Sequence, residues 1–355
     1  MLTLEPRTAG PLRQVLTPVL AIVATMIAGG ILFMLLGKNP VEAIKIIFVD
    51  PLFDAYSRSE LLVKAAPLAL IATGLSFGYR ANVWNIGAEG QFILGAICGG
   101  AVGLAFYGID GWFVLPLMAV AGMLGGFAWA MIPAFLRTRF NANEILVSLM
   151  LVYVATLLLS ALVSGPLRDP DGFNFPESRQ FHDSATLPIL LQGTRVHIGI
   201  VIALLVSLVG WLVLQRHVFG FQIKLMGAAP RAAHFAGVST NRMVYLCLGI
   251  SGALAGLAGM FEAAGPVGQL VPSLPAGYGF TAIIVAFLGR LHPAGIILAS
   301  LVLALTIIGG ETAQYLLQVP KAAISVFQGM LLFFLLAFEI FTRFRLRRSG
   351  AGATA

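Results

Sequence analysis

The sequence predicts an all-α membrane protein with about ten transmembrane helices. Hydrophobic residues make up 59% of the 355 residues and charged residues only 10%, whereas a soluble domain carries about 25% charged residues. So few charges cannot cover a water-facing surface, but they suit a lipid-facing one. The apolar residues also fall into runs of roughly 17–25 residues, the length that a helix needs to cross a bilayer. Inside lipid such runs form helices, because the backbone must satisfy its own hydrogen bonds.

Nine apolar runs have this spanning length, at 18–36, 61–78, 89–107, 112–136, 144–165, 196–215, 242–264, 294–313 and 321–342. A tenth run near 278–289 is too short alone, so it either extends into 265–277 or stays re-entrant. Small-residue steps such as Gly252 and Gly256 let helix backbones approach closely in lipid. Because we find no internal repeat and no linker, we expect one transmembrane domain over 1–355.

The charges predict the topology. With ten spans and a cytoplasmic N-terminus, the inside segments hold 14 of the 22 basic residues and the outside segments nine of the 15 acidic ones. This asymmetry follows the positive-inside rule. Both termini are then cytoplasmic, with a periplasmic loop at 166–195, a cytoplasmic loop at 216–242 and a cytoplasmic tail at 343–355. Nine spans would place the basic tail outside.

Enzyme signatures are missing from the sequence. It has no GxxxxGK[ST] loop for ATP phosphates, no HExxH pair for zinc and no GxSxG nucleophile turn. Cys98 and Cys247 are isolated in apolar runs, which is typical of packing residues. The basic tail directly follows an apolar run and lacks an aromatic platform for bases, so it predicts contact with membrane lipid and not with nucleic acid. We therefore expect no catalytic residue, no metal and no cofactor on this chain.

Four acidic residues fall in or at the ends of apolar runs: Glu89, Glu262, Glu311 and Glu339. An acid in mid-bilayer costs roughly 2.5–3.5 kcal/mol and usually faces a cavity or a partner. Glu89 opens a run after a Gly-containing turn, where its carboxylate meets a positive helix end. Two interpretations stay open for it, a structural cap of a broken helix and a polar group lining a substrate pathway. Glu339 precedes the tail arginines and is interpreted as their ion-pair partner.

The predicted cytoplasmic loop contains a candidate docking helix. Gly220, Gly227, Pro230 and Gly237 bracket a stretch at 231–236 that is long enough for a short helix along the membrane surface. Its alanines would leave a face that fits the groove of another protein. A coupling helix docked on a motor domain needs such a face, although an ordinary cytoplasmic loop would account for the same pattern.

Several stretches together resemble the permease branch of ABC importers that serves branched-chain amino acids, ribose and nucleosides. Within that branch they most resemble the larger of the two nucleoside-type permease subunits. The resemblance covers roughly 60–340. The matching stretches are 85–91 (NIGAEGQ), 143–151 (NEILVSLML), 165–170 (GPLRDP), 227–238, Asn241 with Arg242, 251–259 (SGALAGLAG) with Glu262, 277–280 (GYGF), 288–295 (LGRLHPAG) and the last span from Gln328.

The resemblance implies the ABC importer permease fold in a bacterial inner membrane, with import of a nucleoside or a related small polar solute. It implies a tandem-domain ATPase that carries ATP and Mg²⁺, a second homologous permease that forms a heterodimer, and an external substrate-binding (lipo)protein. We assign substrate-pathway roles to Asn82, Trp84, Asn85, Glu89, Asn143 and Glu262. We assign ATPase coupling to Gly227, Ala228, Pro230, Arg231, Ala232, Ala233, His234, Ala236 and Gly237.

Three positions depart from the family pattern, and three functions compete with a nucleoside importer. Position 82 is often Gly, position 84 often Phe and position 152 often Asn, where this chain has Asn82, Trp84 and Val152. An ABC permease for a ribose-like sugar or for another purine-like solute stays open. An ion-coupled secondary transporter with Glu89 and Glu262 as ion carriers is the main alternative of another class, although it would predict inverted repeats. A membrane-embedded enzyme is the third.

Overall fold

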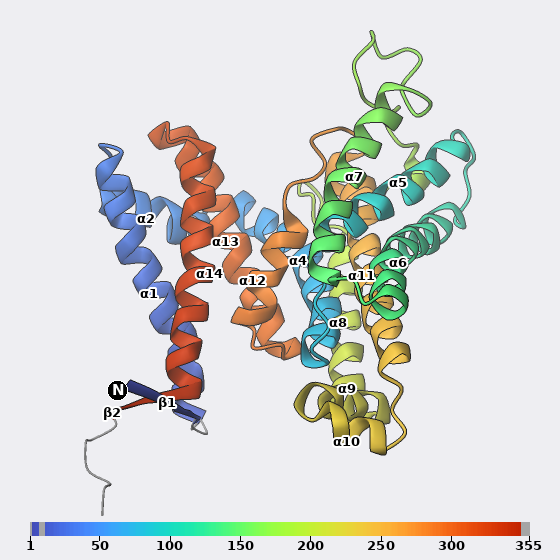
Figure 1. Cartoon of the computed structure of the whole chain (residues 1–355). Coiled ribbons are helices and arrows are strands. Elements are labelled where there is room, and N and C mark those ends of the chain that lie inside the picture. The colour runs from blue at the N-terminus through green and yellow to red at the C-terminus, as the bar shows by residue number, and fades with distance from the viewer. Residues whose placement is uncertain (1, 7–10, 349–355) are drawn as a thin grey trace, which may run out of the picture. The chain divides into compact units, whose positions relative to one another are not determined.

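The computed structural model describes residues 2–6 and 11–348, and the side chains of 16–338 except Pro18. Each of the ten predicted runs forms a helix (Figure 1). Within the described residues, eight helices are long and apolar enough to cross a membrane. The ten are α1 (Pro11–Leu35), α4 (Ala55–Arg80), α5 (Ala88–Ala105), α6 (Val114–Phe140), α7 (Glu144–Ser164), α8 (Gly199–Arg216), α11 (Thr240–Glu262), α12 (Tyr278–Leu288), α13 (Pro293–Leu317) and α14 (Lys321–Arg343).

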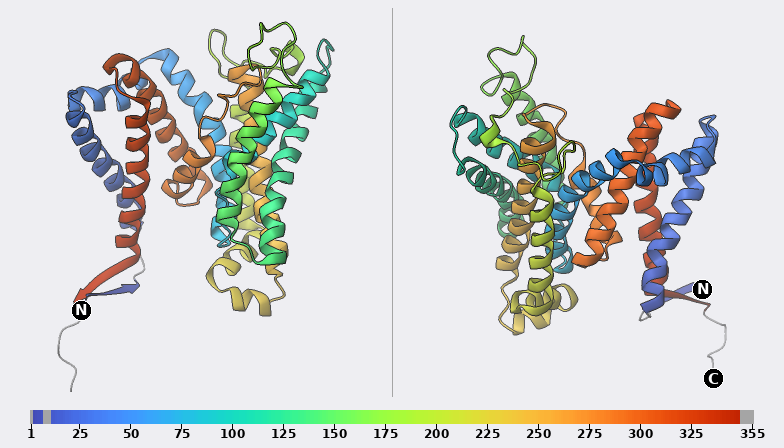
Figure 2. Two further views of the ribbon diagram at one scale, coloured as in Figure 1. Left: turned by 45° about the horizontal axis from the view of Figure 1, so that its top comes forward. Right: turned by 180° about the vertical axis from the view of Figure 1, so that it is seen from behind.

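The chain packs as two compact units, residues 1–55 with 305–355 and residues 56–304. The prediction of a single domain stays a prediction. In the first unit α1 and α14 lie side by side (Figures 1 and 2), and the rings of Phe33 and Phe327 are 6.2 Å apart. Helix α2 (Pro40–Phe48) begins after Asn39, whose side chain accepts from the backbone N–H of Val41 at 3.0 Å. This is the usual way in which an asparagine starts a helix.

Besides α2, three elements of the first unit were not predicted. Strand β1 (Leu2–Pro6) pairs antiparallel with strand β2 (Phe344–Arg348), so the tail backbone is extended where we expected a plain tail. Helix α3 (Asp50–Phe53) is a single turn. Glu311 lies exposed on α13. The predicted ion pairs of Glu339 with the tail arginines concern side chains outside the described residues.

The core of the second unit is the close packing of α5, α6 and α11. The small residues that recur along these helices, as predicted, allow this close packing. A Cβ atom on Gly95 would collide with the backbone of Gly256, and one on Gly126 would collide with the backbones of Gly252 and Gly256. Because glycines let helix backbones touch in lipid, where apolar side chains gain nothing from leaving water, these positions hold the bundle together. Helix α4 is buried on nearly all sides.

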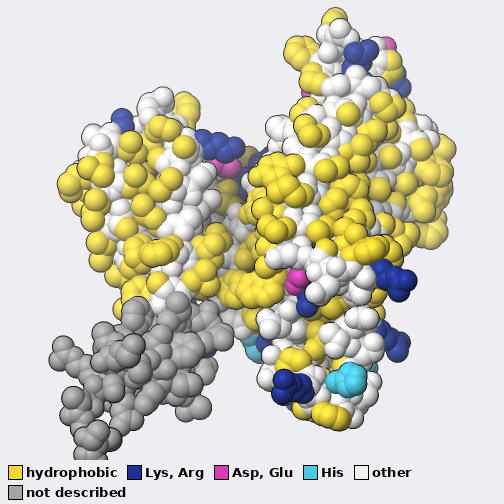
Figure 3. Space-filling view, in the orientation of Figure 1, with side chains coloured by type: hydrophobic (Ala, Val, Ile, Leu, Met, Phe, Trp, Pro, Cys, Tyr) yellow, Lys and Arg dark blue, Asp and Glu magenta, His cyan; other side chains and the backbone are white. Residues whose placement is uncertain are grey.

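The two ends of the second unit differ in character. At one end lie α9 (Val218–Ala228) and α10 (Pro230–Phe235), within the predicted loop 216–242. At the opposite end lies the 165–195 segment, whose only helical turn is η1 (Asp183–Ala185), as all three ribbon views show (Figures 1 and 2). Basic side chains and histidine gather over α9 and α10, whereas apolar side chains cover the spanning helices (Figure 3).

Candidate functional site

Glu89 binds the first turn of α12. Its Oε1 accepts from the N–H of Gly277 at 2.8 Å and its Oε2 accepts from the N–H of Gly279 at 2.5 Å. The carboxylate is 2% exposed. It lies in the first turn of α5 and also caps α12, so the positive ends of two helices meet at one acid. Glu89 therefore caps α12, and not α5, the helix that it opens.

Two glycines make this contact possible. Gly277 has a φ of +81°, a conformation that costs a side-chain-bearing residue energy. A Cβ atom on Gly279 would collide with the backbone of Glu89 and Ala88, so the starts of α5 and α12 touch backbone to backbone. Helix α12 has 11 residues, about 16 Å of length, which is too short to cross a hydrocarbon core of about 30 Å.

Tyr278 connects the second predicted acid to the same segment. Its hydroxyl donates to Oε1 of Glu262 at 3.3 Å, and its ring packs on Phe92 with centroids 5.7 Å apart. Glu262 ends α11, just before the π-helical turn η2 (Ala263–Val267). Glu89 and Glu262, which are far apart in sequence, thus hold one three-residue segment from two sides.

An ion pair with one buried partner lies near Glu262. The Nε atom of Arg195 donates to Oε1 of Glu60 at 2.8 Å, and its Nη2 atom pairs with Oε2. The Glu60 side chain is 4% exposed. This pairing raises the pKa of Arg195 above its usual range. The charges of Lys64 and Arg195 also interact with Glu262, so this end of the bundle gathers two acids, two cations and a phenol.

Sequence reasoning missed Glu60, Arg195 and Tyr278. Glu60 and Arg195 are ordinary charges at the ends of apolar runs, and no local pattern joins two residues 135 positions apart. A weak signal did exist for Tyr278, because it stands between two glycines at the start of the short run. Glycines on both sides of one aromatic residue indicate a backbone that other groups approach closely.

Asn85 is a buried structural residue. Its amide exchanges hydrogen bonds with Gln91 at 2.7 and 3.1 Å, donates to Ser251 at 2.9 Å, and accepts from the N–H of Gly87 at 3.1 Å. Every polar atom of the side chain is therefore occupied. This network ties the turn before α5 to α11.

The other predicted pathway residues lie around that turn. Asn82 is exposed and has a φ of +60°, a conformation that glycine also adopts readily. Trp84 packs against Tyr79 and Phe287, with centroids 5.0 and 6.0 Å apart. Asn143 is the exposed N-cap of α7 and accepts from the N–H of Ile145 at 2.9 Å. The structure thus brings together Glu89 and Glu262 and leaves Asn82 and Asn143 on the exposed surface.

The predicted coupling segment is a helical hairpin. Helix α10 confirms the expected short helix, whereas α9 was not predicted. Gly237, with a φ of +79°, ends the hairpin. The exposed predicted residues are Ala228, Pro230, Arg231, Ala232, His234, Ala236 and Gly237, and Gly227 is half-buried. Phe235, which was not predicted, is 91% exposed.

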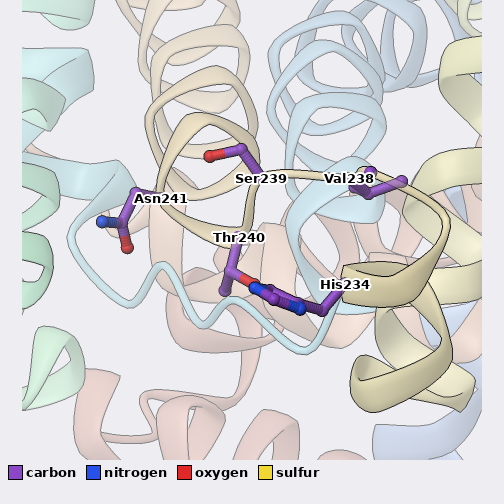
Figure 4. A pocket seen from close by; sticks show the side chains of 6 residues that line it. His234, Val238, Ser239, Thr240 and Asn241 are labelled. Atoms are coloured by element: carbon purple, nitrogen blue, oxygen red, sulfur yellow. The ribbon is translucent and has the colours of Figure 1, made fainter.

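The burial of Ala233 corrects the expected docking face at this residue. Its side chain is 1% exposed and packs in a core with Met226, Val238 and Met243, because the short helix turns this position toward α9 and α11. Ala232 and Ala236, the other two alanines of the expected face, are exposed and remain available to a partner. Beside α10 lies an open hollow of about 410 Å³, lined by His234, Ser239, Thr240 and Asn241 among others (Figure 4).

Together, the apolar spans, the polar contacts inside them and the exposed hairpin at one end define a multi-pass membrane transport protein. Residues 57–336 match the family described as the branched-chain amino acid transport system / permease component. The chain belongs to this family, and its fold is that of an ABC permease. It is therefore a transport subunit and not an enzyme, and the family sets aside the ion-coupled transporter and the membrane-embedded enzyme. Transport systems of this kind include an ATPase and a substrate-binding partner.

Three relatives show the range of the family. The glucose ABC transporter permease protein TsgB13 of Haloferax volcanii is 36% identical over 97% of this chain and 93% of its own. The guanosine ABC transporter permease protein NupP of Bacillus subtilis is 29% identical over 91% of this chain and 93% of its own. NupQ, a second guanosine ABC transporter permease protein of B. subtilis, is 31% identical over 68% of this chain and 77% of its own. No solved structure gave a significant match.

Proposed function

We propose that this chain is the permease subunit of an ATP-driven importer and forms the translocation pathway for a nucleoside. The observation that carries this proposal is the connection from Glu89 through the start of α12 to Glu262, inside the spanning bundle. An acid inside a membrane is costly and marks a functional site by default; here Glu89 positions the start of α12 with both of its oxygens, and the half-buried Glu262 is the acid that a solute would reach. The guanosine permease NupP supports a nucleoside as the solute.

The chemistry of this region suits a hydroxyl-rich ring. Glu262 has one oxygen bound to Tyr278, and its second oxygen is an acceptor for ribose hydroxyl groups. Tyr278 and Phe92 are buried against each other, so in this proposal they position Glu262 for the solute and do not themselves stack on the base. In this mechanism α12, a short helix anchored at its first turn, moves as the bundle alternates between outward and inward access.

The driving force enters through the α9–α10 hairpin in this proposal. A tandem-domain ATPase, which binds ATP and Mg²⁺, docks on the exposed face of α10 around Arg231, His234 and Phe235. Phe235 is exposed and apolar, which is typical of a residue that a partner buries. The hairpin then lies in the cytoplasm of a bacterial inner-membrane protein with both termini inside. This placement agrees with the basic residues around it.

We further propose a heterodimer with a second, homologous permease and delivery of solute by an external substrate-binding (lipo)protein. The support for the pair is that two permeases named for guanosine transport, NupP and NupQ, occur in one organism and both resemble this chain.

A simple sugar is the second candidate solute. The glucose permease TsgB13, at 36% identity, favours it, and sugars share the hydroxyl groups that Glu262 would bind. A nucleoside and a sugar differ in the base, so competition between the two kinds of solute in an uptake assay distinguishes them.

The test is uptake of radiolabelled guanosine and of glucose by cells with and without this chain, in the presence of its partner subunits. We expect ATP-dependent uptake that deletion of this chain abolishes. Unlabelled nucleosides should compete with this uptake more strongly than unlabelled sugars. Competition by sugars alone would favour the second candidate. Uptake by proteoliposomes that contain only this chain would refute the ATP-driven importer.

A further inference from the structure

The segment that follows α7 extends beyond the helix ends of its unit (Figure 1). Residues 168–179 of this segment are called the tip below. The N–H of Asp169 donates to the carbonyl of Glu177 at 2.8 Å, which closes the turn. Arg179 holds both neighbouring acids, Asp169 at 3.3 Å and Asp171 at 2.6 Å, and its guanidinium lies 5.2 Å from the centre of the Tyr107 ring. The ion pairs within the tip therefore fix its conformation before any partner binds.

This tip presents an aromatic side chain to water from a strained backbone. Phe173 is 93% exposed and has a φ of +48°, and the next residue, Asn174, has a φ of +72°. Left-handed backbone costs a bulky residue about 1–2 kcal/mol. Phe175 nearby is 63% exposed. A strained backbone that holds exposed aromatic side chains marks a candidate functional surface.

Arg168 adds a charge that the tip itself does not neutralise. Its Nη1 atom donates to Oδ1 of Asn174 at 2.6 Å, which orients the guanidinium. Among the described residues no carboxylate forms an ion pair with it, in contrast to Arg179. Below the tip is a hollow of about 240 Å³ that Arg168, Arg179, Tyr107 and Pro166 help to line. An oriented arginine without an acid, next to an exposed phenylalanine, fits the composition of interface hot spots.

We propose that Phe173 and Arg168 are the docking site for the substrate-binding protein of the same transport system. The partner places an apolar depression over Phe173 and a carboxylate against Arg168. The proposal rests on the proposed function, which puts this loop on the side from which solute is delivered. A lipid surface fits less well, because the tip extends beyond the helix ends of its unit (Figure 1) and therefore away from the bilayer that those helices span.

The test uses the complete transporter in proteoliposomes, with the purified substrate-binding protein of the system as the probe. Phe173→Ser and Arg168→Glu should each raise the concentration of binding protein for half-maximal uptake by about 30-fold, the effect of losing a hot spot. The maximal rate should stay unchanged. Trp112→Ser is the matched control, because Trp112 is also exposed, at 88%. It lies near the same end, where the carbonyl of Ile109 accepts from Ser184 at 2.8 Å.

A photo-crosslinking residue at position 173 in intact cells supplies a second measurement. A crosslink to the substrate-binding protein that Arg168→Glu abolishes supports the proposal. A crosslink to lipid or to a second permease overturns it, as does equal half-saturation for all variants. If the unmodified transporter imports normally and the variants need the same concentration of binding protein for half-maximal uptake, the docking site alone is refuted. If the unmodified transporter does not import at all, the proposed function fails and the docking site fails with it.

Discussion

Replacing Glu89 by glutamine tests whether this acid holds the start of α12. In the native protein both carboxylate oxygens accept a backbone N–H, from Gly277 and from Gly279. Glutamine has nearly the same shape but only one acceptor oxygen. Its amide NH₂ group would face one of the two N–H donors, and two donors cannot bind each other.

The expected loss follows from these two bonds. A hydrogen bond to a charged group contributes about 1.5–3 kcal/mol, a neutral one about 1 kcal/mol, and a buried donor left unpaired costs about 1–3 kcal/mol. Exchanging two charged bonds for one neutral bond and one unpaired donor therefore destabilises the first turn of α12 by about 3 kcal/mol or more. The site is 2% exposed, so water does not replace the lost acceptor.

Thermal unfolding of the purified protein in detergent and ATP-driven uptake in proteoliposomes measure the consequence. We expect Glu89→Gln to lower Tm by roughly 5 °C and uptake by about tenfold or more. Glu42→Gln is the matched control, because Glu42 is an exposed glutamate in the first turn of α2. There the helix dipole contributes only about 0.3–1 kcal/mol. If both variants behave alike, the assignment of Glu89 as the anchor of α12 is wrong.

Three further perturbations test other parts of the structure. Ala233→Leu should destabilise the protein by about 1–3 kcal/mol in denaturant unfolding, because it overfills a core, whereas Ala232→Leu on the exposed face should not; equal effects would contradict the burial of Ala233. Tyr278→Phe removes only the hydroxyl bound to Glu262, about 1 kcal/mol, and should change uptake kinetics more than Tm; unchanged kinetics would remove Tyr278 from the pathway. His197 precedes α8, is 3% exposed, and burial lowers its pKa to about 4 from an ordinary value of about 6.5. The unfolded chain therefore binds a proton between those pH values and the folded one does not. Stability should fall by about 3 kcal/mol from pH 6.5 to pH 4, and a His197→Gln variant that keeps this slope would refute the cause.

Much of the fold was predictable because the bilayer imposes it. A span must be apolar over a fixed length and helical throughout, so hydropathy alone places α5, α7 and α11 within about two residues at each end. Glycine spacing likewise indicated which helices approach closely, because only a missing side chain allows backbone contact. The short run at 278–289 was also correctly set apart, since 11 residues cannot cross the hydrocarbon core.

What the sequence determined by itself is thus the class of the protein, its ten helices and the small helix at 230–235, since each depends on residues close together in the chain. Only the tertiary structure decided that Glu89 caps α12 and that Ala233 faces inward. Those outcomes depend on which residues meet after the chain folds. A carboxylate binds whichever unpaired N–H groups packing brings to it, and for Glu89 they lie 188 and 190 positions away, where no local pattern reaches.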